Sequence, residues 1–249
     1  MQLQAAIVLA AGKGTRLNNG DPSTKPKVMY EIAGRPMISY TRDLLLKLNI
    51  PQIVFVVGYQ YQVVENYLGQ SFDYAFQEEQ LGTGHALKLG LEKIKSANGY
   101  LLVLQGDDSS FYKPETILDF IEKVATVRAP VGLITSIQDD PGSLGRVIRD
   151  DDGYVEAIIE KAELTPEQEN LKEINCGTYL FNLQWLSDNI NRLIKHEPKG
   201  EYFLPDLIKI AIDEKEKVLA YTLENPQEWM GVNTPEQLEI ADALKKASL

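Results

Sequence analysis

The sequence contains one cysteine, Cys176, and two histidines, His85 and His196, in 249 residues. A single cysteine excludes an intramolecular disulfide framework and a cysteine-based zinc site, and two histidines are too few for a histidine-rich metal centre. No apolar run reaches the roughly 20 residues that a membrane-spanning helix needs. The longest apolar run near the start, from Ala5 to Ala11, follows no basic segment of the kind that begins a signal peptide. These absences predict a cytoplasmic protein without a membrane partner.

Positive charge is also scarce, because 25 lysines and arginines face 36 acidic residues and give a net charge of −11. Nucleic acids and anionic membranes attract basic surfaces, so this balance argues against both as partners. The charge is uneven, however. Residues 1–43 carry six basic and three acidic side chains, a net +3, while the other 206 residues carry −14. Either a small anionic ligand binds near the N-terminus, or this segment is a solvated surface.

Apolar, β-branched runs alternate with helical patterns over the first half of the chain. We expect strands at 4–10, 52–57, 72–76 and 100–105, separated by helices at 37–48, 62–68 and 83–94. This alternation predicts an α/β fold with a doubly wound, mainly parallel sheet. Beyond residue 130 the strand candidates are shorter, at 131–137, 145–149, 154–160 and 177–182, with helices near 185–195 and 202–214. The second half therefore adds antiparallel pairing, and the sheet is predicted to be mixed.

No flexible linker and no internal repeat divides the chain. We therefore expect a single domain over residues 1–249, built from the halves 1–129 and 130–249. Near the end, Thr234-Pro235-Glu236-Gln237 combines a capping threonine, a proline at the first helical position and a glutamine three residues after the cap. The last helix is predicted to begin there.

A glycine-bearing turn, L-A-A-G-K-G-T-R-L from Leu9 to Leu17, follows the first predicted strand. Such a turn lets backbone N–H groups approach a phosphate or a base. It is not the dinucleotide fingerprint, because Leu17 stands where the third glycine belongs, and it lacks the Walker pattern of a phosphate-binding loop. From this turn alone, a ligand-binding loop and a plain tight turn both remain open.

Together with later motifs, this turn resembles the sugar-1-phosphate nucleotidyltransferases, and among them the uridylyltransferase domains that make UDP-N-acetylglucosamine. The similar blocks follow the family's order along the chain: Lys25-Pro26-Lys27-Val28-Met29, Gly34-Arg35-Pro36-Met37, Gln77 with residues 79–86, Gln105-Gly106-Asp107, Gly145-Arg146, Glu160, Glu173-Ile174-Asn175, Gly200-Glu201-Tyr202 and Gly231-Val232-Asn233. The resemblance implies a Rossmann-like, GT-A-like fold, with nucleotide binding in residues 1–129 and sugar binding in residues 130–249. It implies UTP and N-acetylglucosamine 1-phosphate as substrates, with UDP-N-acetylglucosamine and diphosphate as products.

In the implied reaction a phosphate oxygen of the sugar 1-phosphate attacks the α-phosphorus of the triphosphate. The nucleophile is already an anion, so the protein has to position two anions and neutralise their charge rather than supply a general base. The resemblance assigns this catalytic work to Lys13, Arg16 and Lys27 in the cationic N-terminal segment. Lys25 lies near them in sequence. It is either a further cation at the phosphates or a mobile surface lysine.

The resemblance further implies a Mg²⁺ cofactor held by Asp107 and Asn233, which suits a cation that takes one or two protein oxygens. Two roles are open for the neighbouring Asp108: it supports Asp107 from behind, or it is simply a turn residue. His85 is expected to pack or cap a helix rather than to catalyse. The residues that the resemblance assigns to nucleotide binding are Leu9, Ala10, Ala11, Gly12, Gly14, Gln77, Gln80, Gly82, Thr83 and Asp107.

Gly145, Glu160 and Asn175 match the family's sugar contacts. Four positions depart from its pattern: Gln105, Cys176, Phe203 and Pro205 stand where tyrosine, threonine, tyrosine and threonine are usual. Glucose 1-phosphate or a related sugar phosphate, with UTP or another triphosphate, therefore stays an alternative, as does a non-catalytic binding homologue. Residues 234–249 show no hexapeptide repeat, so we expect no acetyltransferase domain. The sequence does not indicate an oligomeric state.

Overall fold

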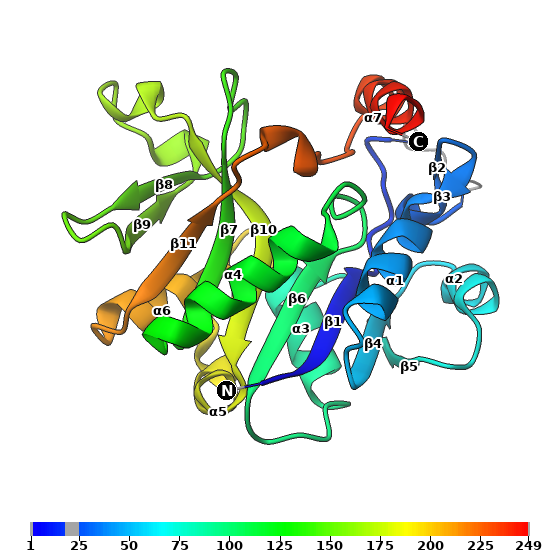
Figure 1. Cartoon of the computed structure of the whole chain (residues 1–249), viewed down its shortest axis with the longest axis horizontal. Helices are drawn as coiled ribbons and strands as arrows, with labels where there is room; N and C mark the ends of the chain where they lie inside the picture. The colour runs from blue at the N-terminus through cyan, green and yellow to red at the C-terminus, as the bar shows by residue number, and fades with distance from the viewer. Residues whose placement is uncertain (1, 18–24, 249) are drawn as a thin grey trace.

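The computed structural model describes residues 2–17 and 25–248. Within them one nine-stranded sheet contains seven strands in the order β11-β7-β10-β6-β1-β4-β5, and the hairpin β8–β9 branches from β10 (Figure 1). The strands are β1 (Leu3–Ala10), β4 (Gln52–Val57), β5 (Asp73–Phe76), β6 (Tyr100–Gln105), β7 (Val131–Ile137), β8 (Arg146–Arg149), β9 (Val155–Ile159), β10 (Glu173–Asn182) and β11 (Val218–Thr222), besides the small pair β2 (Glu31–Ile32) and β3 (Arg35–Pro36).

β1 is apolar and buried from Ala5 to Ala10 because both of its faces are covered there. Its neighbours β4 and β6 run parallel to it, with Ile7 paired to Val54 on one side and to Val103 on the other. β10 is inserted antiparallel between β6 and β7, and β11 pairs parallel with β7. The sheet is thus mixed and mainly parallel, as the sequence predicts.

Helices lie on both faces of this sheet. Ala6 and Val8 belong to the core under α1 (Met37–Lys47), α2 (Tyr61–Leu68) and α4 (Pro114–Val127). Ala5 and Ile7 alternate with them and face the core under α3 (Thr83–Leu91), α5 (Leu183–Asn189) and α6 (Asp206–Asp213). This alternation along one strand produces the three-layer, doubly wound α/β architecture that the sequence predicts.

The last helix, α7 (Pro235–Ala247), lies beside the small strands β2 and β3 (Figure 1). Thr234 and Gln237 form the predicted capping box at its N-terminus. Ala241 of α7 packs with Leu17 and Ile32, and Asp242 accepts a 2.8 Å hydrogen bond from the N–H of Ala33. The C-terminal helix therefore lies against the residues around the glycine loop.

Two observed elements were not predicted, and two predicted elements have other bounds. Helix α4 and strand β11 were not predicted. β10 begins at Glu173 rather than Gly177, because an irregularity between Asn175 and Tyr179 interrupts its pairing with β7 without ending the strand. The helix expected at 185–195 lies at Leu183–Asn189, and a short 3₁₀ turn follows it. In the part of the chain that the structure describes, no helix has the length and apolar character to cross a membrane.

Candidate active site

Three predicted site residues from distant parts of the chain meet at one edge of the sheet. Lys27, on the 3₁₀ turn Lys27–Met29, contacts the carboxylate of Asp107, which follows the C-terminal end of β6. The same ammonium donates a 2.8 Å hydrogen bond to Asn233 Oδ1, and Arg16 Nη2 donates to that oxygen over 3.3 Å. Ligands of open α/β sheets bind at this edge, beyond the carboxyl ends of the parallel strands.

Asn233 is held in place by the start of α7. Its N–H donates a 2.7 Å hydrogen bond to Gln237 Oε1, the side chain that also completes the capping box with Thr234. Pro235 at the first helical position favours the same helix start. The amide oxygen of Asn233 is therefore free to turn toward Lys27, outside the helix.

The glycine loop passes beside this cluster. The Leu9 carbonyl accepts a 3.0 Å hydrogen bond from the N–H of Gly106, which connects the end of β1 to the turn that carries Asp107. Gly14 has a φ of +67°, and a Cβ there would lie 2.9 Å from Lys27 Cβ. Only glycine allows this approach. Ala10 and Ala11 are buried, whereas Gly12 is exposed.

Lys13 does not join these contacts. It is exposed, and its side chain makes no hydrogen bond or ion pair with another residue that the structure describes. Lys25 is also exposed, with its ammonium 5.1 Å from the centre of the Tyr30 ring. Of the predicted cations, Arg16 and Lys27 are thus the two that the structure brings together with Asp107 and Asn233.

On the other side of the glycine loop lie the residues expected to read the base. Gln77 is 4% exposed, and its Nε2 donates a 3.0 Å hydrogen bond to Gly82 O and lies 3.2 Å from His85 Nδ1. Gly82 has a φ of +90° where the chain turns into α3. His85 therefore orients a neighbouring amide, which agrees with its expected packing role.

The remaining residues of this region are also ordered by contacts. Gln80 Nε2 donates to Gln77 O over 3.4 Å, and Thr83 Oγ1 accepts a 3.1 Å hydrogen bond from the N–H of Leu204. Sequence reasoning overlooked Gly58, where a Cβ would lie 2.8 Å from Gln77 O and 3.0 Å from Ala11 Cβ. A glycine directly after β4 was its only signal.

Gly145, Glu160 and Asn175 come together at the base of the hairpin β8–β9. The N–H of Asn175 donates a 3.2 Å hydrogen bond to Gly145 O, and Glu160 Oε1 lies 3.3 Å from where a Cβ on Gly145 would stand. Asn175 Nδ2 donates to Tyr179 over 2.6 Å, which fixes the amide. Burial and the nearby charge of Glu163 raise the pKa of Glu160.

Asp108 differs sharply from its neighbour Asp107. It is 6% exposed, and its Oδ1 has no hydrogen-bond partner among the described residues, as is true of the buried Nε1 of Trp229. Burial, then the charge of Asp107, raise the pKa of Asp108 well above its ordinary range. The carboxylate facing Lys27 is therefore Asp107, and Asp108 lies behind it in the interior.

The four departures from the family pattern occupy different surroundings. Cys176 is buried. The side-chain amide of Gln105 rests on the backbone of Gly177, where an added Cβ would lie 2.4 Å from Gln105 Nε2. Phe203 is 37% exposed and its ring lies 4.9 Å from that of His196. Pro205 caps α6. Gln105 lies two residues before Asp107 at the end of β6.

The donor atoms around Lys27 also fit a divalent cation. Within the described ranges, no group of three or more histidine, cysteine, aspartate or glutamate side chains could hold a metal ion. The Asp107 carboxylate and the Asn233 amide oxygen nevertheless converge on one cation, the Lys27 ammonium. Two hard oxygens on one positive group are the kind of partial set that Mg²⁺ accepts from a protein.

Comparison with known proteins agrees with this architecture. The nucleotidyl transferase family pattern matches residues 5–246. The "bifunctional protein GlmU" of Bacillus velezensis is 37% identical over 246 residues, which are 99% of this chain and 53% of that protein. The protein of the same name from Acetivibrio thermocellus is 36% identical over 243 residues, 98% of this chain and 51% of that protein. The chain spans about half the length of these relatives.

Among solved structures, a putative glucose-1-phosphate thymidylyltransferase from Bacillus anthracis, crystallised with sucrose, superposes with a TM-score of 0.79 at 24% identity. The alignment covers 97% of this chain and 94% of that one, so the two share a fold. With the family pattern extending from β1 into α7, the chain belongs to the nucleotidyl transferase family.

Proposed function

We propose that the chain is a sugar-1-phosphate nucleotidyltransferase that joins UTP and N-acetylglucosamine 1-phosphate into UDP-N-acetylglucosamine and diphosphate. The observation that carries the proposal is the meeting of Lys27, Asp107 and Asn233 beside the glycine loop. A site that combines positive side chains, an exposed glycine-bearing loop and a partial set of oxygen donors suits a polyphosphate substrate.

In this reaction an oxygen of the sugar phosphate forms a bond to the α-phosphorus of UTP, and the bond from that phosphorus to the bridging oxygen of the β-phosphate breaks. Diphosphate leaves with that electron pair. No proton has to be removed from the nucleophile, because the attacking phosphate oxygen is already an anion. Lys27 and Arg16 would lie against the phosphates and offset their charge as the two anions approach. Lys13, exposed on the same loop, would reach the outer phosphates of the triphosphate.

Asp107 and Asn233 would hold Mg²⁺, which supplies charge neutralisation at the phosphate oxygens when bound. Gln77, Gly82 and Thr83 would contact the base, and Gln80 would support them. Leu9, Ala10, Ala11 and Gly12 would line it with their backbone. Gly145, Glu160 and Asn175 would contact the sugar, and their convergence at the hairpin base is what supports that assignment.

A second candidate substrate is glucose 1-phosphate. It is favoured by Gln105, Cys176, Phe203 and Pro205, which replace the family's usual residues, and a protein of the same fold is named as a putative glucose-1-phosphate thymidylyltransferase. A polar amide at Gln105 against the Gly177 backbone would change the shape of the pocket near the sugar phosphate.

Diphosphate release from a panel of triphosphates and sugar 1-phosphates tests both. The proposal expects the highest kcat/KM for UTP with N-acetylglucosamine 1-phosphate, and an Asp107→Ala variant that loses it. A preference for glucose 1-phosphate would replace the first substrate by the second. No diphosphate from any pair with the wild type would instead point to a non-catalytic binding protein.

A further inference from the structure

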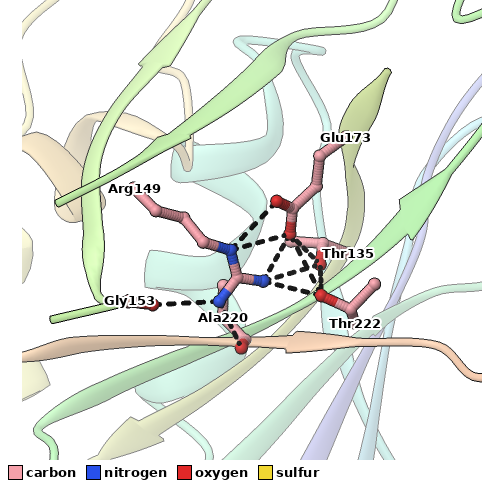
Figure 2. Close-up of polar contacts among 6 residues, drawn as sticks. All are labelled: Thr135, Arg149, Gly153, Glu173, Ala220 and Thr222. Carbon is pink, nitrogen blue, oxygen red and sulfur yellow. Dashed lines mark hydrogen bonds and ion pairs between the residues drawn. The ribbon is translucent and has the colours of Figure 1, made fainter. Parts of the chain in front are cut away.

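A polar network away from the phosphate-binding cluster ties the hairpin β8–β9 to the rest of the sheet (Figure 2). Its centre is Arg149, at the end of β8, and Glu173, at the start of β10. Arg149 Nε donates to Glu173 Oε2 over 2.9 Å, and Nη2 contacts Glu173 Oε1. The side chains are 27% and 15% exposed, so water screens this pair less than an ordinary surface ion pair.

The guanidinium uses every N–H that it has. Besides Glu173, Nη2 donates to Thr222 Oγ1 over 2.7 Å, and Nη1 donates to Gly153 O at 2.9 Å and to Ala220 O at 3.2 Å. Five donors in a rigid fork thus contact β10, β11 and the turn of the hairpin at once. A lysine could not reproduce this geometry, because its three donors diverge from a single nitrogen.

The carboxylate of Glu173 is satisfied from the other side. Thr135 Oγ1, on β7, donates to Glu173 Oε1 over 2.6 Å, and Thr222 Oγ1 lies 3.2 Å from the same oxygen. Burial alone would raise the pKa of Glu173, but the hydrogen bonds from Arg149 and Thr135 and the charge of Arg149 outweigh it and lower that pKa. The network therefore stays ionic at neutral pH.

The hairpin has little other backbone attachment to the sheet. β8 pairs with β10 only at Arg146 and Ile174, whereas β10 and β7 pair at six positions. Arg146 is buried and bonds to Leu171 O at 3.1 Å, close to the open end of the hairpin. Val147 and Val155 pack the hairpin into the core beside α6. Polar side chains hold it to β10 at two further points, Arg146 near the open end and Arg149 one strand length away.

The open end of this hairpin carries two of the predicted sugar contacts, one before β8 and one after β9. Gly145 immediately precedes β8 and Glu160 immediately follows β9, while Asn175 lies two residues after Glu173 on the same face of β10. Arg149 is four residues from Gly145, about 13 Å along an extended strand. Arg149 lies on the strand that follows Gly145, and Glu173 lies on the strand that carries Asn175. Their ion pair therefore joins the two strands on which the predicted sugar contacts depend.

We propose that Arg149 and Glu173 are positioning residues for the sugar 1-phosphate: they hold the hairpin β8–β9 at the angle that places Gly145 and Glu160 beside Asn175, without touching the substrate. The proposal rests on the proposed function, since it assigns the sugar side to these three residues. It predicts that loss of the pair weakens recognition of the sugar phosphate and leaves that of the triphosphate unchanged.

The first experiment compares steady-state kinetics of Arg149→Met, Glu173→Leu and the double variant with the wild type. Each single variant is expected to raise the KM for the sugar 1-phosphate by about tenfold, because displacements of about 1 Å in a site cost that much or more. The KM for UTP should stay within about twofold. Lys172→Met is the matched control, since Lys172 adjoins Glu173 but pairs with the fully exposed Asp139.

The double variant separates positioning from plain stabilisation. Removing both charges leaves no unpaired buried ion, so its melting temperature should recover relative to the single variants. Its KM for the sugar 1-phosphate should nevertheless stay raised, because the polar link between β8 and β10 at Arg149 is still absent. If that KM recovers together with stability, or if the KM values of both substrates rise in parallel, the positioning role is wrong.

Hydrogen–deuterium exchange decides the mechanical claim without any turnover. Amides of residues 145–160 should exchange faster in Arg149→Met than in the wild type, and amides of residues 3–10 in β1 should not. Unchanged exchange in the hairpin would overturn the proposal even if the enzyme were active. A wild type that turns over no sugar 1-phosphate would refute the proposed function, and the exchange result would still decide whether the pair fixes the hairpin.

Discussion

Lys27 Nζ lies 2.8 Å from Asn233 Oδ1 although 206 residues separate the two, and the same ammonium contacts the Asp107 carboxylate. Three elements make this possible: the 3₁₀ turn after the glycine loop, the end of β6 and the capped start of α7. A cation and two oxygen donors are thus assembled at the sheet edge by the fold itself. Four predictions depend on the surroundings of this cluster.

Replacing Lys27 by methionine should lower kcat for diphosphate release by about a hundredfold or more, the cost of one charge-stabilising group in a phosphate site. The side chain keeps its length and apolar stem, so the fold should remain intact. Lys25→Met is the matched control. Because Lys25 is exposed, its loss should change kcat by less than about threefold. Equal effects of the two variants would show that Lys27 acts only through overall charge.

Metal affinity measured without substrates gives a second prediction. Asp107→Asn should weaken Mn²⁺ binding, followed by electron paramagnetic resonance, by about tenfold or more, since it removes a charged oxygen ligand. Lys27→Met should instead tighten it several-fold, because the ammonium contacts the same two oxygens that the ion would use. If Lys27→Met binds Mn²⁺ no better than the wild type, the ammonium and the metal do not share this position.

The central strands could be predicted from sequence because burial on both faces leaves a direct signature. The runs 5–10 and 100–104 within β1 and β6 are buried and apolar, and glycine-containing turns follow both strands. Helix α4 was missed, although Pro114 begins it and Ile117, Phe120 and Val124 have helical spacing on its buried face. β11 was missed because Val218–Thr222 is short and lies at the sheet's edge beside β7.

The sequence names residues that the structure brings together, but it does not show the contacts between them. Asp107 and Asn233 were named from motifs, yet nothing local in the sequence shows that α7 returns to the glycine loop. Asp108 sits in D-D-S-S, a pattern that looks like an exposed turn, and only tertiary packing buries it. The ion pair between Arg149 and Glu173 was likewise invisible, because it joins strands whose pairing the sequence does not specify.

The buried carboxyl of Asp108 predicts a pH dependence of stability. Burial and the charge of Asp107 raise its pKa well above the ordinary value in the folded chain. The folded chain therefore keeps a proton that the unfolded chain releases at about pH 4. Rising pH then removes stability through this group. Asp108→Asn lacks the dependence, so relative to the wild type it should gain more than about 1 kcal/mol of unfolding free energy between about pH 5 and about pH 8.

Urea denaturation of both proteins at the two pH values measures this difference, and Asp151→Asn, in an exposed turn, is the control that should show none. A difference between Asp108→Asn and the wild type that is constant with pH would mean that Asp108 is ionised in the folded protein. If Asp108→Asn instead loses unfolding free energy relative to the wild type as pH rises, the sign of the linkage is reversed and burial is not its cause.

Gly14 gives the last prediction, because two different costs of adding a methyl group can be separated there. Gly14 and Gly34 have φ values of +67° and +74°, but a Cβ on Gly14 would lie 2.9 Å from Lys27 Cβ, whereas a Cβ on Gly34 would meet nothing within 4 Å. Both alanine variants should lose about 1–2 kcal/mol of stability from the backbone alone. Only Gly14→Ala should also push Lys27 away from Asp107 and lower kcat by about tenfold or more. Urea denaturation and diphosphate release measure the two effects, and a fully active Gly14→Ala would mean that the loop can move without carrying Lys27 with it.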